Sequence, residues 1–216
     1  MPESLSFGVA PVDKLLPAAP SGSSILLVND PGVESEAFLY QVAHHHFTMG
    51  HPVVYACTTR PPSSVKSAML EHGFDPDPDK HELVFVDLFS ALLGGGEEAA
   101  YTVDDPSDIQ QIAQVLKQAA DEHPGAVLCI DSLSGLADQA TPEQLVEQAP
   151  ALTDALSAYA YSVSLFTDWP YGFDKRELTD RFDAVIRVGG LEERVVFGQY
   201  FQVQRAAWAQ EISPQR

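Results

Sequence analysis

The chain has 216 residues, 45% of them hydrophobic, which is enough for one domain with a substantial core. It carries 31 acidic and 12 basic residues, a net charge of -19 with no basic run, and this argues against a sequence-independent grip on nucleic acid. No stretch approaches the ~20 apolar residues of a membrane span, and the first residues lack the basic and apolar regions of a signal peptide.

Apolar runs and helical patterns alternate along the chain. Strands are predicted at residues 25–28, 52–57, 83–87, 126–131, 162–167 and 184–188. A helix is predicted over 36–49, ending at Gly50, and a second over 63–72, ending at Gly73. The first of these helices places five residues on one face: Leu39, Val42, Ala43, His46 and Phe47.

The connections and later helices are marked by turn and capping residues. Residues 75–79 are a turn-rich connector, and 94–104 are predicted to form a flexible loop. Asp105 and Pro106 are expected to begin a helix as its N-cap and first residue. Thr141 begins a capping-box pattern, and Pro150 should kink or split the helix that follows. Gly189-Gly190 looks like a turn, and 194–203 alternates like a closing hairpin.

This alternation is typical of an α/β protein, a three-layer α/β/α sandwich with a mostly parallel central sheet and here a C-terminal β-hairpin. We find no internal repeat and no convincing linker. The expected organisation is a single domain, 1–216, with an N-terminal segment at 1–20, a core at 21–190, and a hairpin and tail at 191–216.

The stretch VNDPGVESEAF, residues 28–38, lies where a strand runs into a helix and has the spacing of a Walker A loop. That motif, G-x-x-x-x-G-K-[ST], surrounds phosphates with backbone N–H groups, neutralises them with lysine and holds Mg²⁺ with a hydroxyl. Here the two glycine positions hold Asn29 and Glu34, the lysine position holds Ser35, and the hydroxyl position holds Glu36. Asp30 to Val33 keep a familiar interior turn.

Four stretches then resemble one family, in order. They are LSFGVAPVDKLL at 5–16, SGSSILLV at 21–28, LVFVDLFS at 83–90 and CIDSLSGL at 129–136. Together with the strand that ends at Thr167, they are similar to archaeal KaiC-like proteins of the RecA superfamily over about residues 5–205. The resemblance implies a RecA-like, P-loop NTPase-type fold with a vestigial nucleotide site at Pro31, Gly32, Val33, Ser35 and Asp131.

The resemblance also implies which catalytic groups are missing. Asp131 falls on the Walker B aspartate, which holds a Mg²⁺-bound water. The family's paired glutamates after the second strand are replaced by Cys57-Thr58-Thr59-Arg60, so the general base is absent. The family's K-x-R pair, which reaches a neighbouring subunit's phosphate, aligns with Arg205-Ala206-Ala207 and keeps one cation.

These changes reverse the charge of the loop. At ~5 Å and an effective dielectric constant near 20, each carboxylate–phosphate pair costs on the order of 3 kcal/mol before screening. We therefore predict no ATP hydrolysis, no catalytic residue and no cofactor; the alternative is a slow enzyme that binds ATP and Mg²⁺ through substituted contacts. Asp131 can equally cap a helix, Gly32 can persist for its turn, and Glu34 and Glu36 suit the positive end of a helix.

Other patterns have ordinary structural interpretations. His44, His45 and His46 point about 100° apart on a helix, so they cannot all bind one metal ion, and only His46 faces the core. The two cysteines lie in apolar strands, which favours buried thiols over a disulfide. The late aromatics Phe197 and Phe201 are assigned to the core, whereas Trp208 and the 169–173 stretch stay open between core and ligand contact.

The leading hypothesis is a regulatory or signalling module that acts through a protein partner or a homo-oligomer, with 94–104 and the hairpin as candidate surfaces. A recombinase-paralogue role on DNA is a third alternative, which the charge disfavours. Evenly spread acidity and only five lysines predict the cytoplasm of a salt-accumulating halophile, where a Debye length of ~3 Å screens self-repulsion. An acidic mesophilic protein is the alternative.

Overall fold

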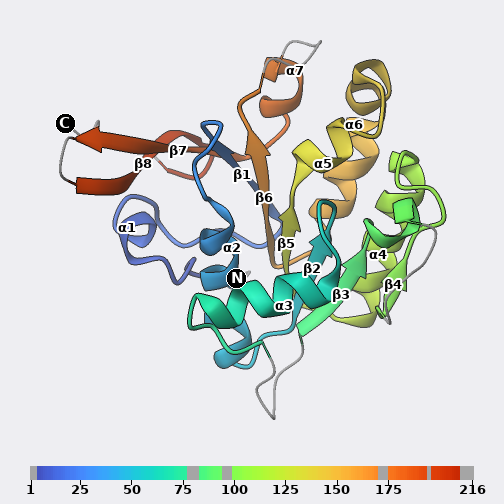
Figure 1. Cartoon of the computed structure of the whole chain (residues 1–216), viewed down its shortest axis with the longest axis horizontal. Helices are drawn as coiled ribbons and strands as arrows, with labels where there is room; N and C mark the ends of the chain where they lie inside the picture. Colours follow the sequence, from blue (N-terminus) through green and yellow to red (C-terminus); the bar gives the residue numbers. More distant parts are fainter. Residues whose placement is uncertain (1–3, 77–82, 94–98, 170–174, 194–195, 210–216) are drawn as a thin grey trace.

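The computed structural model describes residues 4–76, 83–93, 99–169, 175–193 and 196–209. Its strands form one eight-stranded sheet in the order β4-β3-β2-β5-β6-β1-β7-β8 (Figure 1). All neighbouring strands are parallel except β7 and β8, which form an antiparallel hairpin. The predicted α/β/α sandwich with a mostly parallel sheet and a C-terminal hairpin is confirmed.

The strands are β1 (Ser23–Asn29), β2 (Val53–Cys57), β3 (Leu83–Asp87), β4 (Tyr101–Thr102), β5 (Val127–Asp131), β6 (Tyr161–Thr167), β7 (Ala184–Glu193) and β8 (Val196–Ala206). The helices are α1 (Ala10–Asp13), α2 (Glu36–Thr48), α3 (Pro62–Glu71), η1 (Ser90–Leu93, a 3₁₀ turn), α4 (Ile109–Glu122), α5 (Leu133–Ala137), α6 (Pro142–Leu156) and α7 (Lys175–Thr179). Each predicted strand is present to within a few residues, because its apolar run is long and bounded by turn residues.

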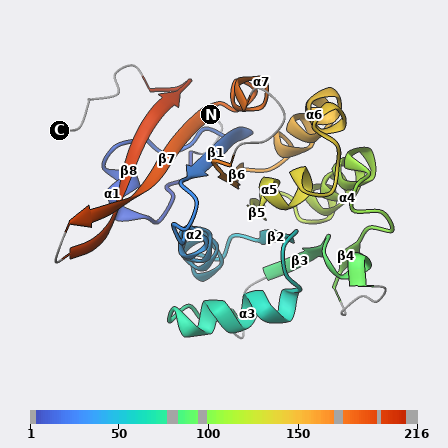
Figure 2. The same cartoon turned by 45° about the horizontal axis from the view of Figure 1, so that its top comes forward.

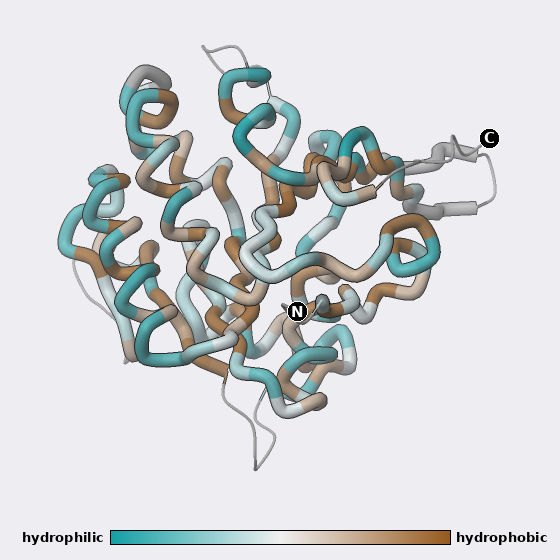
Figure 3. Tube along the Cα trace, turned by 180° about the vertical axis from the view of Figure 1, so that it is seen from behind, coloured by the Kyte–Doolittle hydropathy of each residue, from teal (hydrophilic) through white to brown (hydrophobic). Residues whose placement is uncertain are grey.

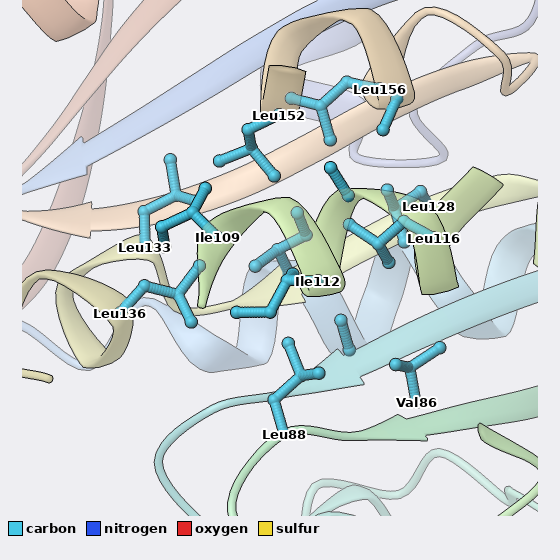
Figure 4. Close-up of a cluster of buried hydrophobic side chains, with 14 of the residues drawn as sticks. Val86, Leu88, Ile109, Ile112, Leu116, Leu128, Leu133, Leu136, Leu152 and Leu156 are labelled. Carbon is cyan, nitrogen blue, oxygen red and sulfur yellow. The ribbon is translucent and has the colours of Figure 1, made fainter. Parts of the chain in front are cut away.

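The sheet separates two hydrophobic layers (Figure 2). Helices α4, α5 and α6 pack on one face, where Ile112, Leu116 and Leu152 meet the strands (Figure 4). Helices α1, α2 and α3 cover the other face through residues such as Leu39 and Phe47. The hydropathy of the chain agrees with this layering, since the helical coils at the outside of the molecule alternate between hydrophilic and hydrophobic segments, as expected for helices with one buried face (Figure 3).

The N-terminal segment is held on the α2 layer by a buried histidine. His46 is 1% exposed, and its Nε2 lies 3.0 Å from the Ser6 carbonyl oxygen and 2.6 Å from Tyr161 Oη. Burial lowers the pKa of His46 to about 4, so the ring is neutral near pH 7. The predicted core position of His46 is confirmed. No group of three or more metal-ligating side chains occurs among the described residues.

Two predicted helix features are wrong in detail. Helix α4 begins at Ile109, not at Pro106, because the Asp108 carboxylate caps it by accepting from the backbone N–H groups of Gln110 and Gln111. Asp105 instead binds the backbone N–H and hydroxyl of Ser107 in a turn before the helix. Helix α6, of 15 residues, continues unbroken through Pro150 behind a complete Thr141 capping box. The predicted split is therefore wrong, and the alternative, a kink at Pro150, stays a prediction.

The predicted glycine turn is also wrong. Gly189 and Gly190 lie inside β7, paired with Tyr200 and Gln199 of β8, and the strand continues to Glu193. A Cβ atom at Gly189 would overlap the Tyr200 ring, so glycine serves here to admit an aromatic neighbour and not to turn the chain.

Within the loop expected at 94–104, Tyr101 and Thr102 instead form β4 at the edge of the sheet, so this part of the prediction is wrong. Two residues show no periodicity, so pattern reasoning could not find this strand. Residues 94–98, most of the 75–79 connector and the side chain of Phe197 lie outside the described part of the chain. Phe201 packs against Phe38, as assigned, and the Trp208 indole N–H donates to the Pro17 carbonyl at 3.2 Å. Cys57 and Cys129 are buried thiols that form no disulfide.

Candidate functional site

The candidate site lies where the carboxyl ends of four parallel strands meet. The register places Asn29 of β1 beside Thr167 of β6, and Cys57 of β2 beside Asp131 of β5. In open parallel sheets, ligands bind at this edge. A cavity of about 390 Å³ opens here. It is lined by Asn29, Ser35, Glu36, Thr59, Asp131, Ser132, Ser134, Gly135, Asp138, Leu165, Thr167 and Trp169.

The loop after β1 is folded around the side chain of Asn29. The Asn29 amide nitrogen lies 3.3 Å from the Asp30 carbonyl and 3.4 Å from the Val33 carbonyl, and it reaches Thr167 Oγ1 at 3.4 Å. The Val33 N–H is used within the loop, donating to the Asp30 carbonyl at 3.1 Å. A phosphate cradle needs converging N–H groups. In this loop two carbonyl oxygens instead point toward the side-chain amide of Asn29.

An arginine of β7, Arg187, fixes the same loop to the sheet. The Arg187 guanidinium of β7 pairs with Asp30 in the loop and, at 3.1 Å, with Asp168 just after β6. These contacts connect β7 to the residues that follow β1 and β6, next to Asn29 and Trp169, which line the cavity.

The central feature is an ion-pair network around Arg60. Its Nη2 lies 3.2 Å from Asp131 Oδ2 and 3.4 Å from Glu36 Oε1. Asp131 is 2% exposed and also accepts a hydrogen bond from the Tyr55 hydroxyl at 3.3 Å. From the sequence, Glu36 is assigned to the Walker A hydroxyl position and Asp131 to the Walker B position, and these assignments stay predictions. One guanidinium from beyond the end of β2 therefore contacts both carboxylates and balances one of their two negative charges.

Burial dominates the electrostatics of this network. Burial raises the pKa of the Asp131 carboxyl, and Arg60 opposes that rise. Burial alone would lower the pKa of Arg60, but Asp131, Tyr40 and Glu36 raise it overall. Tyr55 is fully buried, and its burial raises its pKa, so its hydroxyl stays a donor to Asp131. Attraction between Arg60 and the carboxylates of Glu36 and Asp131 therefore offsets part of the cost of burying these charges.

Hydroxyl groups fix the floor of the cavity. The Ser132 N–H donates to Thr58 Oγ1 at 2.6 Å, and the Thr58 hydroxyl donates to the Ser132 carbonyl at 2.7 Å. The Thr167 N–H donates to Ser134 Oγ at 2.7 Å. These contacts connect the ends of β2, β5 and β6 around Asp131.

The predicted site residues are brought together only in part. Ser35 and Asp131 line the cavity, whereas Pro31 and Gly32 are exposed on the loop and Val33 is half-buried away from the lining. Arg205 donates to the carbonyls of Thr179 at 2.6 Å and Phe182 at 2.5 Å, near the end of α7. Its guanidinium is therefore engaged within its own chain.

Sequence reasoning missed the two arginines that organise the site. Arg60 was noted only as one of the residues that replace the general base, and Arg187 was read only as part of a strand. The available signal was charge at strand ends: in a chain with 12 basic residues, an arginine beside a parallel strand end has carboxylates within reach.

Three comparisons place these observations among known proteins. The chain matches the family described as "ATPase: KaiC" over residues 6–195. It is 27% identical over 187 residues to a UPF0273 protein of Thermotoga maritima, covering 84% of this chain and 77% of that protein. It is 30% identical over 133 residues to the UPF0273 protein PH0284 of Pyrococcus horikoshii, covering 60% of this chain and 54%, about half, of that protein.

Two solved structures from Pyrococcus horikoshii share the fold. The KaiC-like protein PH0186 superposes with a TM-score of 0.74 at 14% identity, covering 97% of this chain and 91% of that one. The protein PH0321, solved in complex with an unknown peptide, superposes with a TM-score of 0.73 at 18% identity, covering 94% and 92%. No helix among the described residues has the length and apolar character needed to cross a membrane.

Proposed function

This chain belongs to the KaiC family of ATPases, and we propose that it is a member that does not hydrolyse ATP and acts through protein contacts, as a regulatory or signalling module. The family membership agrees with the resemblance found in the sequence. The loss of catalysis and the role in protein contacts are our inference from the strand-end site.

The observation that carries the proposal is the Glu36–Arg60–Asp131 network. Magnesium chemistry needs the Walker B carboxylate and a Walker A hydroxyl turned toward the metal. Here the Arg60 guanidinium contacts the residues assigned to both positions: it lies 3.4 Å from the Glu36 carboxylate and 3.2 Å from the Asp131 carboxylate. A triphosphate would also meet the carboxylate of Glu36 and the loop carbonyls that surround the Asn29 amide. The residues present do not fit Mg²⁺-ATP, and we derive no reaction step through it.

A role in protein contacts is supported by what remains on this face. The cavity at the strand ends is open, and the Trp169 indole at its margin is 55% exposed. Exposed aromatic side chains are enriched at protein interfaces. Because PH0321, which shares the fold, was solved with a peptide, we extend peptide or protein binding to this chain as part of the proposal.

The decisive experiment is a titration of the full chain with labelled ATP and Mg²⁺ in molar KCl, with phosphate release followed in parallel. We expect no saturable binding at millimolar nucleotide and no release above background. Micromolar binding, or turnover abolished by Asp131→Asn, would overturn the proposal.

A gain-of-function variant sharpens this test. The triple change Glu34→Gly, Ser35→Lys and Glu36→Thr restores three of the four Walker A residues, leaving Asn29 at the first glycine position, and releases Arg60 from Glu36. We expect at least tenfold tighter ATP binding than in the parent, because the repulsion of about 3 kcal/mol per carboxylate is removed. The control is the triple variant Asp121→Asn, Glu147→Gln and Gln114→Lys. It also removes two carboxylates and adds one lysine, but at exposed helix positions, so the change in net charge is the same. Equal gains in both variants would show a nonspecific charge effect and contradict the assignment of the loop.

A second candidate is a slow ATP-binding enzyme with substituted phosphate contacts. The cavity of about 390 Å³ beside Ser35 and Asp131 favours it, since a ligand has room there. The same titration decides between the two candidates.

A further inference from the structure

The strand-end cavity has a negatively charged lining. Glu36, Asp131 and Asp138 contribute carboxylates to it, and none of the described residues that line it is basic. Arg60, which lies beside the cavity, balances one of these three charges and leaves two. Asp138 is exposed, and the side chain of Glu36 is 38% exposed. The lining therefore repels an anion and attracts a cation.

Two oxygen atoms in the cavity also lack a hydrogen-bond partner. Asp131 is 2% exposed and Ser35 is 3% exposed. Arg60 and the Tyr55 hydroxyl both contact Oδ2 of Asp131, so Oδ1 has no hydrogen bond within the described chain. Ser35 Oγ caps no backbone N–H of α2 and has no other partner there. Unlike Asn29 Oδ1, which is unpartnered but fully enclosed, these two oxygens keep some surface on the cavity. A ligand that donates hydrogen bonds would satisfy both.

The donor groups and the cavity margin indicate the kind of cation. The described part of the chain contains no group of acidic, histidine or cysteine side chains that could hold a metal ion, so the three carboxylates do not define a metal site. A guanidinium is a planar cation with five N–H donors, which can contact several separated oxygens and stack on an aromatic ring. The Trp169 indole, 55% exposed, offers such a ring at the cavity.

We propose that the strand-end cavity binds an arginine side chain of a partner protein. The guanidinium donates to Asp131 Oδ1 and Ser35 Oγ, its charge is balanced by Glu36 and Asp138, and its flat face stacks on Trp169. This inference rests on the proposed role in protein contacts and names the chemistry that the partner brings to the same site. The two proposals fail differently: bound ATP would refute the proposed function, whereas a missing response to peptide would refute this inference alone.

The test uses the full-length chain and three probes. The first is acetyl-Gly-Arg-Gly-amide, the second has glutamine in place of arginine, and the third is ethylguanidine, which has the cation but no peptide. The chain has two tryptophans, so the two indole N–H signals of the ¹⁵N-labelled protein are followed during each titration. Trp208→Phe assigns them.

We expect the arginine peptide to shift the Trp169 signal with a dissociation constant on the order of 1 mM, because a tripeptide makes few contacts. The Trp208 signal should stay in place, since that indole donates to the Pro17 carbonyl away from the cavity. The glutamine peptide should bind about tenfold more weakly, because it lacks the charged donors. Ethylguanidine should shift the same signal more weakly than the arginine peptide.

Three outcomes would overturn the proposal. If no probe shifts the Trp169 signal, the cavity does not bind a guanidinium. If the glutamine peptide binds as well as the arginine peptide, the cation is not recognised. If ethylguanidine binds as well as the arginine peptide, the ligand is a small guanidine compound and not a partner protein.

Variants locate the contacts. Asp138→Asn should weaken the arginine peptide about threefold in dilute salt and less in molar KCl, because the lost charge is exposed. Ser35→Ala removes one hydroxyl and should weaken it about fivefold. The matched control Asp121→Asn removes the same charge at an exposed position of α4 and should have no effect. Equal effects of Asp138→Asn and Asp121→Asn would contradict the site. The Trp169 response needs no variant of the cavity, so it decides the matter even if Ser35→Ala fails to fold.

Discussion

Arg60 is a partly exposed cation between two carboxylates from different elements, one at the start of α2 and one at the end of β5. Its side chain is 30% exposed, whereas that of Asp131 is only 3% exposed. Removing the guanidinium would leave the aspartate buried without its counter-ion, which is the costly direction for a buried ion pair.

Arg60→Gln should therefore lower the free energy of unfolding by about 3 kcal/mol, measured by urea denaturation in molar KCl. Adding Asp131→Asn should recover part of the loss, because the uncompensated charge disappears. The matched control is Lys117→Gln, which breaks the exposed pair with Asp154 and should change stability by less than about 1 kcal/mol. A loss as small as that of the control would show that Arg60 does not stabilise the buried carboxylate.

Arg60 also shows which features of the site can be predicted from the sequence and which cannot. The position of the 28–38 loop between a strand and a helix and that of Asp131 at a strand end were predictable, because both follow from the local sequence pattern; their Walker A and Walker B roles stay predictions. The pairing of Arg60 with Glu36 and Asp131 was not, since it joins residues far apart in sequence. Nor could the Asn29 side chain be expected inside its own loop, because only backbone conformation decides which way the carbonyl groups turn.

At the scale of elements, the β7–β8 hairpin depends on a close contact that no periodicity reveals. Gly189 leaves room for the ring of Tyr200, which is its partner across the two strands. The sequence interpretation made the glycine pair a turn, since adjacent glycines more often reverse a chain than lie within a strand. Here the missing side chain is used for packing.

Gly189→Ala should destabilise the protein by about 2 kcal/mol, because the added methyl group displaces a packed aromatic ring. Thermal unfolding measures the loss. The double variant Gly189→Ala with Tyr200→Ala should lose less than the sum of the two single variants, since the clash is then absent. Strict additivity would contradict the contact.

At the scale of the whole molecule, the fold was predictable to a greater extent than the site. The long apolar strands and the apolar face of α4 determine the two layers of the core. Both patterns can be recognised even when the predicted boundaries are wrong by a few residues. The two-residue β4 and the later start of α4 were missed, because a short edge strand and a competing cap at Asp105 depend on neighbours in space.

The net charge of -19 also acts at this scale. We propose that the protein is suited to a salt-rich cytoplasm, and its melting temperature should then keep rising as KCl increases into the molar range. Each kcal/mol gained by screening corresponds to about 2–4 °C in a domain of this size. An acidic mesophilic protein would instead level off near physiological salt, where the Debye length is already about 8 Å. Sucrose, which is excluded from the surface without screening charge, is the control.

The length of β7 has a last consequence. Its residues 184–188 are bonded to β1 on one side and to β8 on the other, whereas 189–193 have β8 as their only strand partner within the described part of the chain. Two strands without a third are only marginally stable in water. The outer half of this ribbon is thus the part of the sheet that can peel away with the least loss of buried surface, while the inner half remains anchored beside Asn29.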